Sequence, residues 1–292
     1  MESAQPTEAS LYLHKLAARL VQPYLAMPEL RAIILTGSAA EGISDFYSDL
    51  DVILYYEQLP SVDAFARADA QNGVQNPQAL VERTETQYME YYDFNGVECQ
   101  LGHTTVAEWE ADMALVLEKL DVQSPLQKAL GGMDEVIILY GEPLVRMWQK
   151  RLEDYPQSLA VAMVQHYLSF PAVWSLHDRL ATRDGTLWFT EMLVSNVQNL
   201  LGTLAGLNHL YFSTFQFKRM QHFIARMKIA PSDFGRRLEA IFHLPPAKAV
   251  LELESLARET IALVEQHLPE IDTSRTKRAI GWRPQPWALP TE

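Results

Sequence analysis

Hydrophobic and polar positions follow two different rhythms along the chain. In the first half, short aliphatic runs of strand length are bounded by turn residues. These runs predict strands at 31–36, 50–56, 84–93, 97–102 and 135–140. Apolar residues at helical spacing predict helices at 9–26, 61–70 and 105–120. Asn95-Gly96, between two of the strand runs, is typical of a hairpin turn.

After about residue 157 the strand pattern almost disappears and apolar residues recur at helical spacing. Helices are expected at 157–181, 186–211, 215–229, 232–243 and 246–268. The fold class is therefore α+β, with a mixed N-terminal domain over residues 1–150 and an all-helical domain over 151–270, joined by a linker near 143–157. Residues 271–292 form a tail that is rich in proline, arginine and tryptophan and has no periodicity.

Composition limits the function classes. The 292 residues include 37 acidic and 24 basic side chains, a net charge of −13, which disfavours nucleic acid as a partner. No apolar run approaches the ~20 residues of a membrane span. The N-terminus MESAQPTEAS lacks the basic start and apolar core of a signal peptide, and Cys99 is the single cysteine. We therefore expect a cytoplasmic protein without a membrane partner.

The stretch ILTGSAAEGISDFYSDLDVILYY, residues 33–55, contains the clearest chemistry. Asp49 and Asp51 are two residues apart at the start of a strand, so both side chains project from one face. Two carboxylates this close are unfavourable unless a cation lies between them. Oxygen-only ligands favour Mg²⁺, which takes its remaining ligands from water and substrate phosphates.

Gly37-Ser38 lies between a strand and a short helix, where backbone N–H groups can hold a phosphate. A phosphate-binding turn beside Mg²⁺ carboxylates is what phosphoryl or nucleotidyl transfer requires. A third carboxylate is expected from a neighbouring strand, and Glu98 is the first candidate. It is expected to bind metal, to act as general base, or both, while Glu90 and Asp93 remain alternatives.

These residues resemble a known family. Gly37-Ser38, ten residues, and then Asp49-Leu50-Asp51-Val52 is similar to the signature of the DNA polymerase β-type nucleotidyltransferase superfamily, and Ser48 matches the frequent Ser-Asp-Leu-Asp form. A catalytic domain followed by a helical domain is similar to the antibiotic nucleotidyltransferases that act on aminoglycosides or lincosamides. The motif covers about 20 residues, and the domain order extends the resemblance loosely over most of the chain.

The resemblance implies a small mixed sheet flanked by helices. It also implies a Mg²⁺-dependent reaction, with two ions, that moves a nucleoside monophosphate from a nucleoside triphosphate to a hydroxyl group of a small acceptor and releases pyrophosphate. Asp49, Asp51 and Glu98 would bind metal. Gly37, Ser38 and Ser48 would lie at the nucleotide, and the helical domain would supply a basic residue to the triphosphate. Lys218 is the candidate for that residue, with Arg219 as its substitute.

Two other functions stay open. One is nucleotidylation of a toxin-like protein partner. Helical partners of such enzymes carry an Arg-x4–6-His motif, and Arg237 and His243 of this chain match that spacing loosely. The other is a non-catalytic nucleotide-binding regulator, which a missing metal carboxylate would favour. The pattern leaves the acceptor, the nucleotide preference and the oligomeric state undetermined.

Several further residues have a structural interpretation that outweighs a functional one. His103 ends the strand that carries Glu98, and we expect no catalytic role for it. Carboxylates near 105–120 are expected on the solvated face of a helix: Glu108, Glu110 and Asp112. Aromatic residues that could stack on a base are expected to pack within the domain instead: Tyr88, Tyr91, Tyr92 and Trp109.

Overall fold

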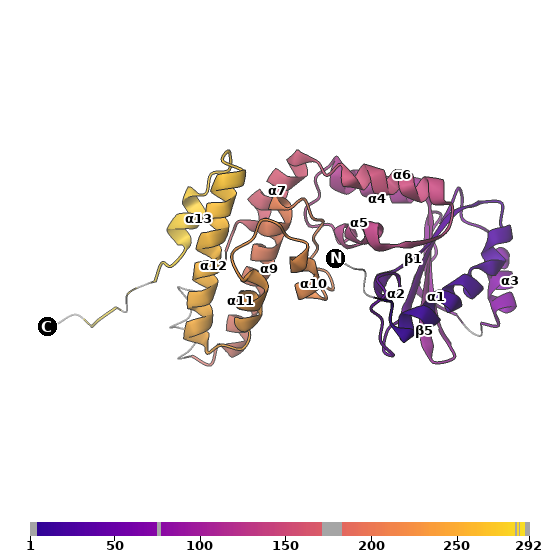
Figure 1. Cartoon of the computed structure of the whole chain (residues 1–292), viewed down its shortest axis with the longest axis horizontal. Coiled ribbons are helices and arrows are strands. Elements are labelled where there is room, and N and C mark those ends of the chain that lie inside the picture. Colours follow the sequence, from indigo (N-terminus) through magenta and orange to yellow (C-terminus); the bar gives the residue numbers. More distant parts are fainter. Residues whose placement is uncertain (1–4, 75–76, 171–182, 284, 286, 290–292) are drawn as a thin grey trace. The chain divides into compact units, whose positions relative to one another are not determined.

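The chain forms two compact units. The computed structural model describes residues 5–74, 77–170, 183–283, 285 and 287–289. The first unit contains Met1–Lys119 and Ala129–Asp154, and the second contains Leu120–Lys128 and Tyr155–Glu292. The first is a mixed sheet with helices and the second is helical (Figure 1). Within the described residues, no helix is both long enough and apolar enough to cross a membrane.

A six-stranded mixed sheet organises the first unit, in the order β3-β4-β5-β2-β1-β6. The β2 and β5 strands are parallel, and every other neighbouring pair is antiparallel. The strands are β1 (Leu30–Thr36), β2 (Leu50–Tyr56), β3 (Gln78–Val81), β4 (Gln87–Phe94), β5 (Val97–Thr105) and β6 (Ile137–Tyr140). All five expected strands are present, and β3 is an additional edge strand whose residues are all exposed.

The helices of the first unit begin and end at recognisable residues. The expected helix at 9–26 is α1 (Glu8–Leu20) followed by the 3-10 helix η1 (Gln22–Ala26), because Pro23 cannot continue an α-helix. The expected linker near 143–157 is largely a helix, α6 (Glu142–Glu153), which starts with Pro143 in its first turn. The others are α2 (Gly37–Ala40), α3 (Val62–Asn72), α4 (Val106–Leu117) and η2 (Met133–Glu135), while α5 (Leu126–Gly132) begins in the second unit and ends in the first.

Different helices pack on the two faces of the sheet. On one face, the buried side chains of β1, β2, β4 and β5 form the main core with α1 and Phe65 of α3. On the other face, Tyr55 of β2 packs against Trp109 of α4 and Trp148 of α6, with ring centroids 5.8 and 4.7 Å away. Residues of β2 therefore alternate between the two layers.

The second unit is built on two packed helix pairs. Helix α9 (Thr186–Leu207) packs against α7 (Gln157–Tyr167) and α12 (Pro246–His267). A Cβ atom on Gly202 would lie 2.3 Å from the ring of Tyr167, so glycine permits the close approach of α7 and α9. Two further helices are shorter than expected, α10 (Met220–Ala225) and α11 (Phe234–Ala240), and α13 (Ser274–Ala279) forms in the expected tail.

Segment 120–128 belongs to the second unit although residues on both sides of it belong to the first. The side chain of Gln127 is fully buried and donates to the carbonyl of Val122 at 2.8 Å. Its Oε1 accepts from the backbone N–H of Phe212 at 3.2 Å, and Tyr167 donates its hydroxyl to Val122. The segment is therefore fixed by residues that follow it by some 40 to 90 positions.

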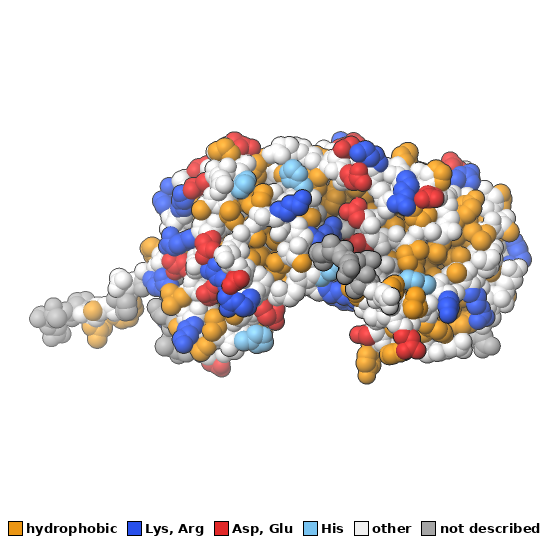
Figure 2. Space-filling view, viewed as in Figure 1, with side chains coloured by type: hydrophobic (Ala, Val, Ile, Leu, Met, Phe, Trp, Pro, Cys, Tyr) orange, Lys and Arg blue, Asp and Glu red, His pale blue; other side chains and the backbone are white. Residues whose placement is uncertain are grey.

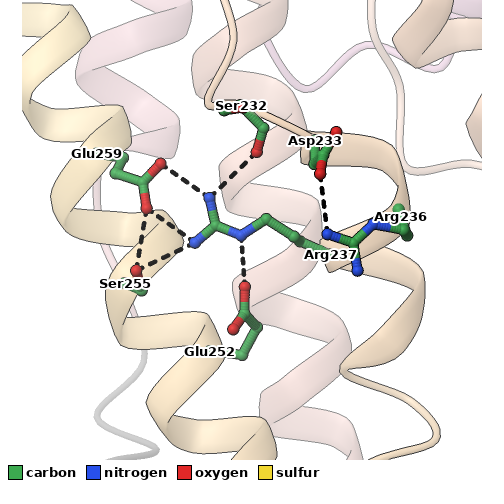
Figure 3. Close-up of polar contacts among 7 residues, drawn as sticks. All are labelled: Ser232, Asp233, Arg236, Arg237, Glu252, Ser255 and Glu259. Atoms are coloured by element: carbon green, nitrogen blue, oxygen red, sulfur yellow. Dashed lines mark hydrogen bonds and ion pairs between the residues drawn. The ribbon is translucent and has the colours of Figure 1, made fainter.

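Ion pairs hold the last helices together. Arg237 of α11 donates to both carboxylate oxygens of Glu259 at 2.8 Å and also to Glu252 and Ser255, all on α12 (Figure 3). Because a bidentate arginine pair is among the stronger surface contacts, it fixes α11 on α12. The surface over α12 and α13 mixes basic and acidic side chains (Figure 2).

Candidate functional site

The two aspartates lie where β2 begins. Asp51 is level with Thr36 of β1 on one side and with Gln100 of β5 on the other. Asp49 directly precedes the strand, and both aspartates are partly buried. Because side chains alternate along a strand, Asp51 lies on the face of Tyr55, at the opposite end of β2.

Glu98 joins them through a shared amide. It is an exposed residue of β5, on the same face as Gln100. The Gln100 Nε2 donates to Glu98 Oε1 at 2.9 Å and to Asp49 Oδ2 at 3.4 Å. One neutral side chain therefore connects two of the three predicted carboxylates. The alternation of β5 places Gln100 on the site face, but this bridging bond depends on the register of β2 against β5, which the sequence pattern does not give.

Gly37 lies against the third carboxylate. Its φ is +67°, in the left-handed region, and a Cβ atom added to it would lie 2.7 Å from Oδ2 of Asp51. Both conformation and space therefore restrict this position to glycine. A side chain at this position would be pressed against the carboxylate of Asp51.

The predicted serines contribute to the connecting loop. The hydroxyl of Ser38 lies 3.0 Å from the hydroxyl of Ser44. Ser48 Oγ donates to Asp45 Oδ1 at 3.2 Å and accepts from the backbone N–H of Asp45 at 3.0 Å. These bonds shape the loop between Gly37 and Asp49, and contact of either serine with a nucleotide stays a prediction.

The two alternatives to Glu98 have other roles. Glu90 pairs with Leu101 in the register of β4 and β5, so it lies on the opposite face of the sheet. Asp93 is directly across from Glu98 and its Oδ1 accepts from the N–H of Gly96, so it stabilises the hairpin turn. A two-residue turn at Asn95-Gly96 fixes this register. The register, and with it the placement of Glu90 away from the site, could therefore have been predicted from the sequence.

On that opposite face a second polar cluster is fully enclosed. His103 is 1% exposed, with its Nδ1 3.0 Å from the hydroxyl of Tyr56 and its Nε2 3.4 Å from Glu90 Oε1. Tyr24 donates to Asp69 at 3.4 Å, and burial, followed by the charge of Glu90, raises the pKa of Asp69 to about 7. The cluster lies in the main core of this unit.

Three of the four aromatic candidates pack inside the unit, as expected, whereas Tyr91 lies across from Gln100 on the face of the candidate carboxylates. Tyr88 and Tyr92 lie on the core face of β4, and Trp109 contacts Tyr55 and Trp148. Tyr91 donates to Gln78 of β3. Of the helix carboxylates, Glu110 accepts from the indole N–H of Trp148 at 3.0 Å, while burial and then Glu108 raise the pKa of Asp112.

Lys218 belongs to the second unit. It is exposed and precedes α10 rather than lying within a helix over 215–229. Arg219 is the residue before the helix and has a left-handed backbone, φ +57°. A role for either residue toward a triphosphate stays a prediction.

The carboxylates fit a magnesium site in their chemistry. Their donors are oxygens, which Mg²⁺ prefers, and the backbone of Gly37 approaches the carboxylate of Asp51 closely. In the part of the chain that the structure describes, Gln100 is the polar side-chain partner of Asp49 and Glu98, and neither forms an ion pair. The ligand atoms of the three do not all lie within 4.8 Å of one another, so a common ion would require side-chain rotation.

Comparison with solved structures gives matches at low similarity, among them a nucleotidyltransferase-like protein from Exiguobacterium sibiricum 255-15. That match has 13% identity and a TM-score of 0.42, and it covers 88% of this chain and 79% of that one. No protein-family model and no curated protein matches the chain. A likeness at this level is too distant to assign an activity.

Proposed function

We propose that the protein is a Mg²⁺-dependent nucleotidyltransferase that moves a nucleoside monophosphate from a nucleoside triphosphate to a hydroxyl of a small molecule. The supporting observation is the gathering of Asp49, Asp51 and Glu98 on one sheet face, where Gln100 joins two of them and Gly37 lies against the third. Asp49 and Glu98 form no ion pair among the described residues, and carboxylates of this kind are suited to bind a cation.

Each residue has a distinct role in this proposal. Asp49, Asp51 and Glu98 would hold magnesium, which when bound neutralises phosphate charge. The N–H groups at Gly37-Ser38 would position the triphosphate. The hydroxyl oxygen of the small molecule would attack the α-phosphorus, and Glu98 would take up the proton of that hydroxyl. The bond between the α- and β-phosphates then breaks and pyrophosphate leaves.

The acceptor is proposed from charge and resemblance. A chain of net charge −13 suits a cationic acceptor, and aminoglycosides and lincosamides are the first compounds to examine. Lys218 of the second unit is proposed to bind the triphosphate. Arg237 is engaged by Glu259 and Glu252, so its observed contacts are those of a structural residue.

The test measures pyrophosphate release and acceptor mass together. The purified chain is incubated with Mg²⁺, each of the four ribonucleoside triphosphates, and a panel of aminoglycosides, lincosamides and neutral sugars. We expect pyrophosphate release together with an acceptor that has gained one nucleoside monophosphate. Asp49→Asn should abolish both, whereas Asp93→Asn, which removes a carboxylate outside the set, should retain both.

Other outcomes would contradict the proposal in different ways. A mass gain on a co-purified protein, with no modified small molecule, would favour protein nucleotidylation. Tight nucleotide binding without turnover in the presence of every acceptor would favour a regulator. Absence of nucleotide binding with Mg²⁺ would refute all three interpretations.

A further inference from the structure

Two neighbouring aromatic side chains project into solvent beside the candidate site. Phe46 is 85% exposed and Tyr47 is 100% exposed. No other aromatic side chain among the described residues of the first unit is more than half exposed. Exposing large aromatic surface is unfavourable in water, so a pair of this kind calls for an explanation.

The loop that carries them is firmly anchored. Thr7, which caps α1, donates its backbone N–H to the carbonyl of Gly42 at 3.0 Å and its hydroxyl to the carbonyl of Ser44 at 2.7 Å. The N–H of Ser44 in turn donates to Ser10 Oγ at 2.9 Å. The base of the loop is therefore held against the start of α1.

The tip is held by its own bonds. Asp45 Oδ1 accepts from the N–H of Tyr47 at 2.9 Å and from Ser48 Oγ at 3.2 Å. The N–H of Ser48 donates to the carbonyl of Asp45. The turn thus fixes the backbone beneath both aromatic residues, and ordering them for a ligand would require little further loss of backbone freedom.

The position of the pair relative to the aspartates limits what it can contact. Tyr47 is two residues before Asp49, so their Cα atoms lie at most about 7.6 Å apart. A triphosphate bound by Asp49, Asp51 and the Gly37 turn has its base tethered through the ribose. The base therefore stays within a fixed distance of these carboxylates, whereas for the acceptor the reaction fixes only the attacking hydroxyl beside the α-phosphate.

We propose that Phe46 and Tyr47 form the stacking surface for the base of the nucleoside triphosphate. This inference rests on the proposed function and adds the base-binding residues to it. An aromatic ring stacks on any base, since every base has a π-face, and the surface therefore increases affinity without selecting strongly among bases. Phosphate binding is left to Gly37 and the carboxylates.

The test compares a nucleotide with a ligand that has the same phosphates and no base. Calorimetric titrations in Mg²⁺ use ATP, GTP, CTP, UTP and inorganic tripolyphosphate. For Phe46→Ala/Tyr47→Ala we expect about tenfold weaker binding of every nucleotide that the native chain binds, and unchanged binding of tripolyphosphate. The exchange Phe46→Tyr/Tyr47→Phe, which keeps both rings, should restore nucleotide affinity to within about twofold of the native chain.

Tyr12→Ala supplies the matched control, since it removes a half-exposed tyrosine from α1. It should bind both kinds of ligand as the native chain does. Equal loss of nucleotide and tripolyphosphate in the double alanine variant would overturn the inference, because the loop would then act on the phosphate site. Unchanged nucleotide affinity with a raised KM for the acceptor would overturn it by assigning the rings to the acceptor.

The native chain separates failure of the inference from failure of the proposed function. If it binds Mg²⁺-nucleotide and tripolyphosphate but the alanine variant is indistinguishable from it, the stacking surface alone is refuted. If the native chain binds neither ligand, the proposed function is refuted as well.

Discussion

Both faces of the sheet in the first unit carry acidic residues, but these residues differ in burial and in their polar contacts. On the core face, Glu90 is 1% exposed and contacts His103 and Tyr88. On the other face, Glu98 is exposed and shares an uncharged amide with Asp49. The same two strands, β4 and β5, place both glutamates.

The difference separates a structural from a functional arrangement. A buried carboxylate persists when neighbouring donors compensate its lost hydration, and Glu90 has such donors. Among the described residues, Asp49 and Glu98 share the uncharged amide of Gln100 and have no ion pair, so no opposite charge in the fold compensates theirs. Charge that the fold does not compensate is available for a ligand.

The largest expected effect removes the aspartates. Asp49→Asn or Asp51→Asn should lower nucleotidyl transfer by about 1,000-fold or more, because a metal site loses a charged ligand. The melting temperature without metal should stay the same or rise, since two carboxylates no longer repel each other. Full activity in either variant, measured by pyrophosphate release, would remove the functional side of the comparison.

A smaller effect is expected at the glutamate of the open face. Glu98→Gln should reduce turnover by about 100-fold while nucleotide affinity is mostly retained, as expected for loss of a general base. Asp93→Asn, directly across the hairpin, should keep turnover within about twofold. Unchanged turnover for Glu98→Gln would exclude Glu98 from the site.

Substitutions on the core face of the sheet should lower stability. Glu90→Ala or His103→Ala should each lower the free energy of unfolding by about 3 kcal/mol, because the remaining partner is left buried without its contact. Turnover per folded molecule should not change. Urea denaturation together with activity assays of the folded fraction would check both statements, and a loss of turnover without a loss of stability would merge the two faces into one site.

The last expected effect is a pH dependence of stability from Asp69. Its pKa is raised in the folded state to about 7, so the folded chain binds more protons than the unfolded one between about pH 4 and pH 7. Stability should therefore fall as pH rises through this range, and Asp69→Asn should flatten that part of the profile. Thermal melts of both chains from pH 5 to pH 8 provide the measurement, and identical profiles would contradict the assignment.

The sequence pattern correctly predicted elements that depend mainly on local residues. Residues 50–56 form β2 as expected, and Asn95 and Gly96 adopt positive φ in the expected hairpin. The placement of Asp49 and Asp51 on one side followed from the period of a strand. Their identity as a metal site remains a prediction.

Elements that depend on distant contacts were missed. The expected helix over 215–229 is reduced to α10, where Phe217 and Phe223 pack on the buried ring of Phe212, and the backbone N–H of Phe212 is bonded to Gln127. Edge strand β3 is exposed throughout, so it has no buried face to produce an alternating pattern. The boundary expected near residue 150 lies within α6 (Glu142–Glu153), whose start is favoured by Pro143 in its first turn.

The course of segment 120–128 has a consequence for how the protein is made. Gln127 obtains its backbone partner at Phe212 only after another 85 residues have left the ribosome. Until then this stretch is tethered at both ends to a domain to which it does not belong. A fragment ending at residue 154 would contain segment 120–128 without its partners. Such a fragment would therefore be less stable than the same unit in the full chain, although residue 154 is the last residue of that unit.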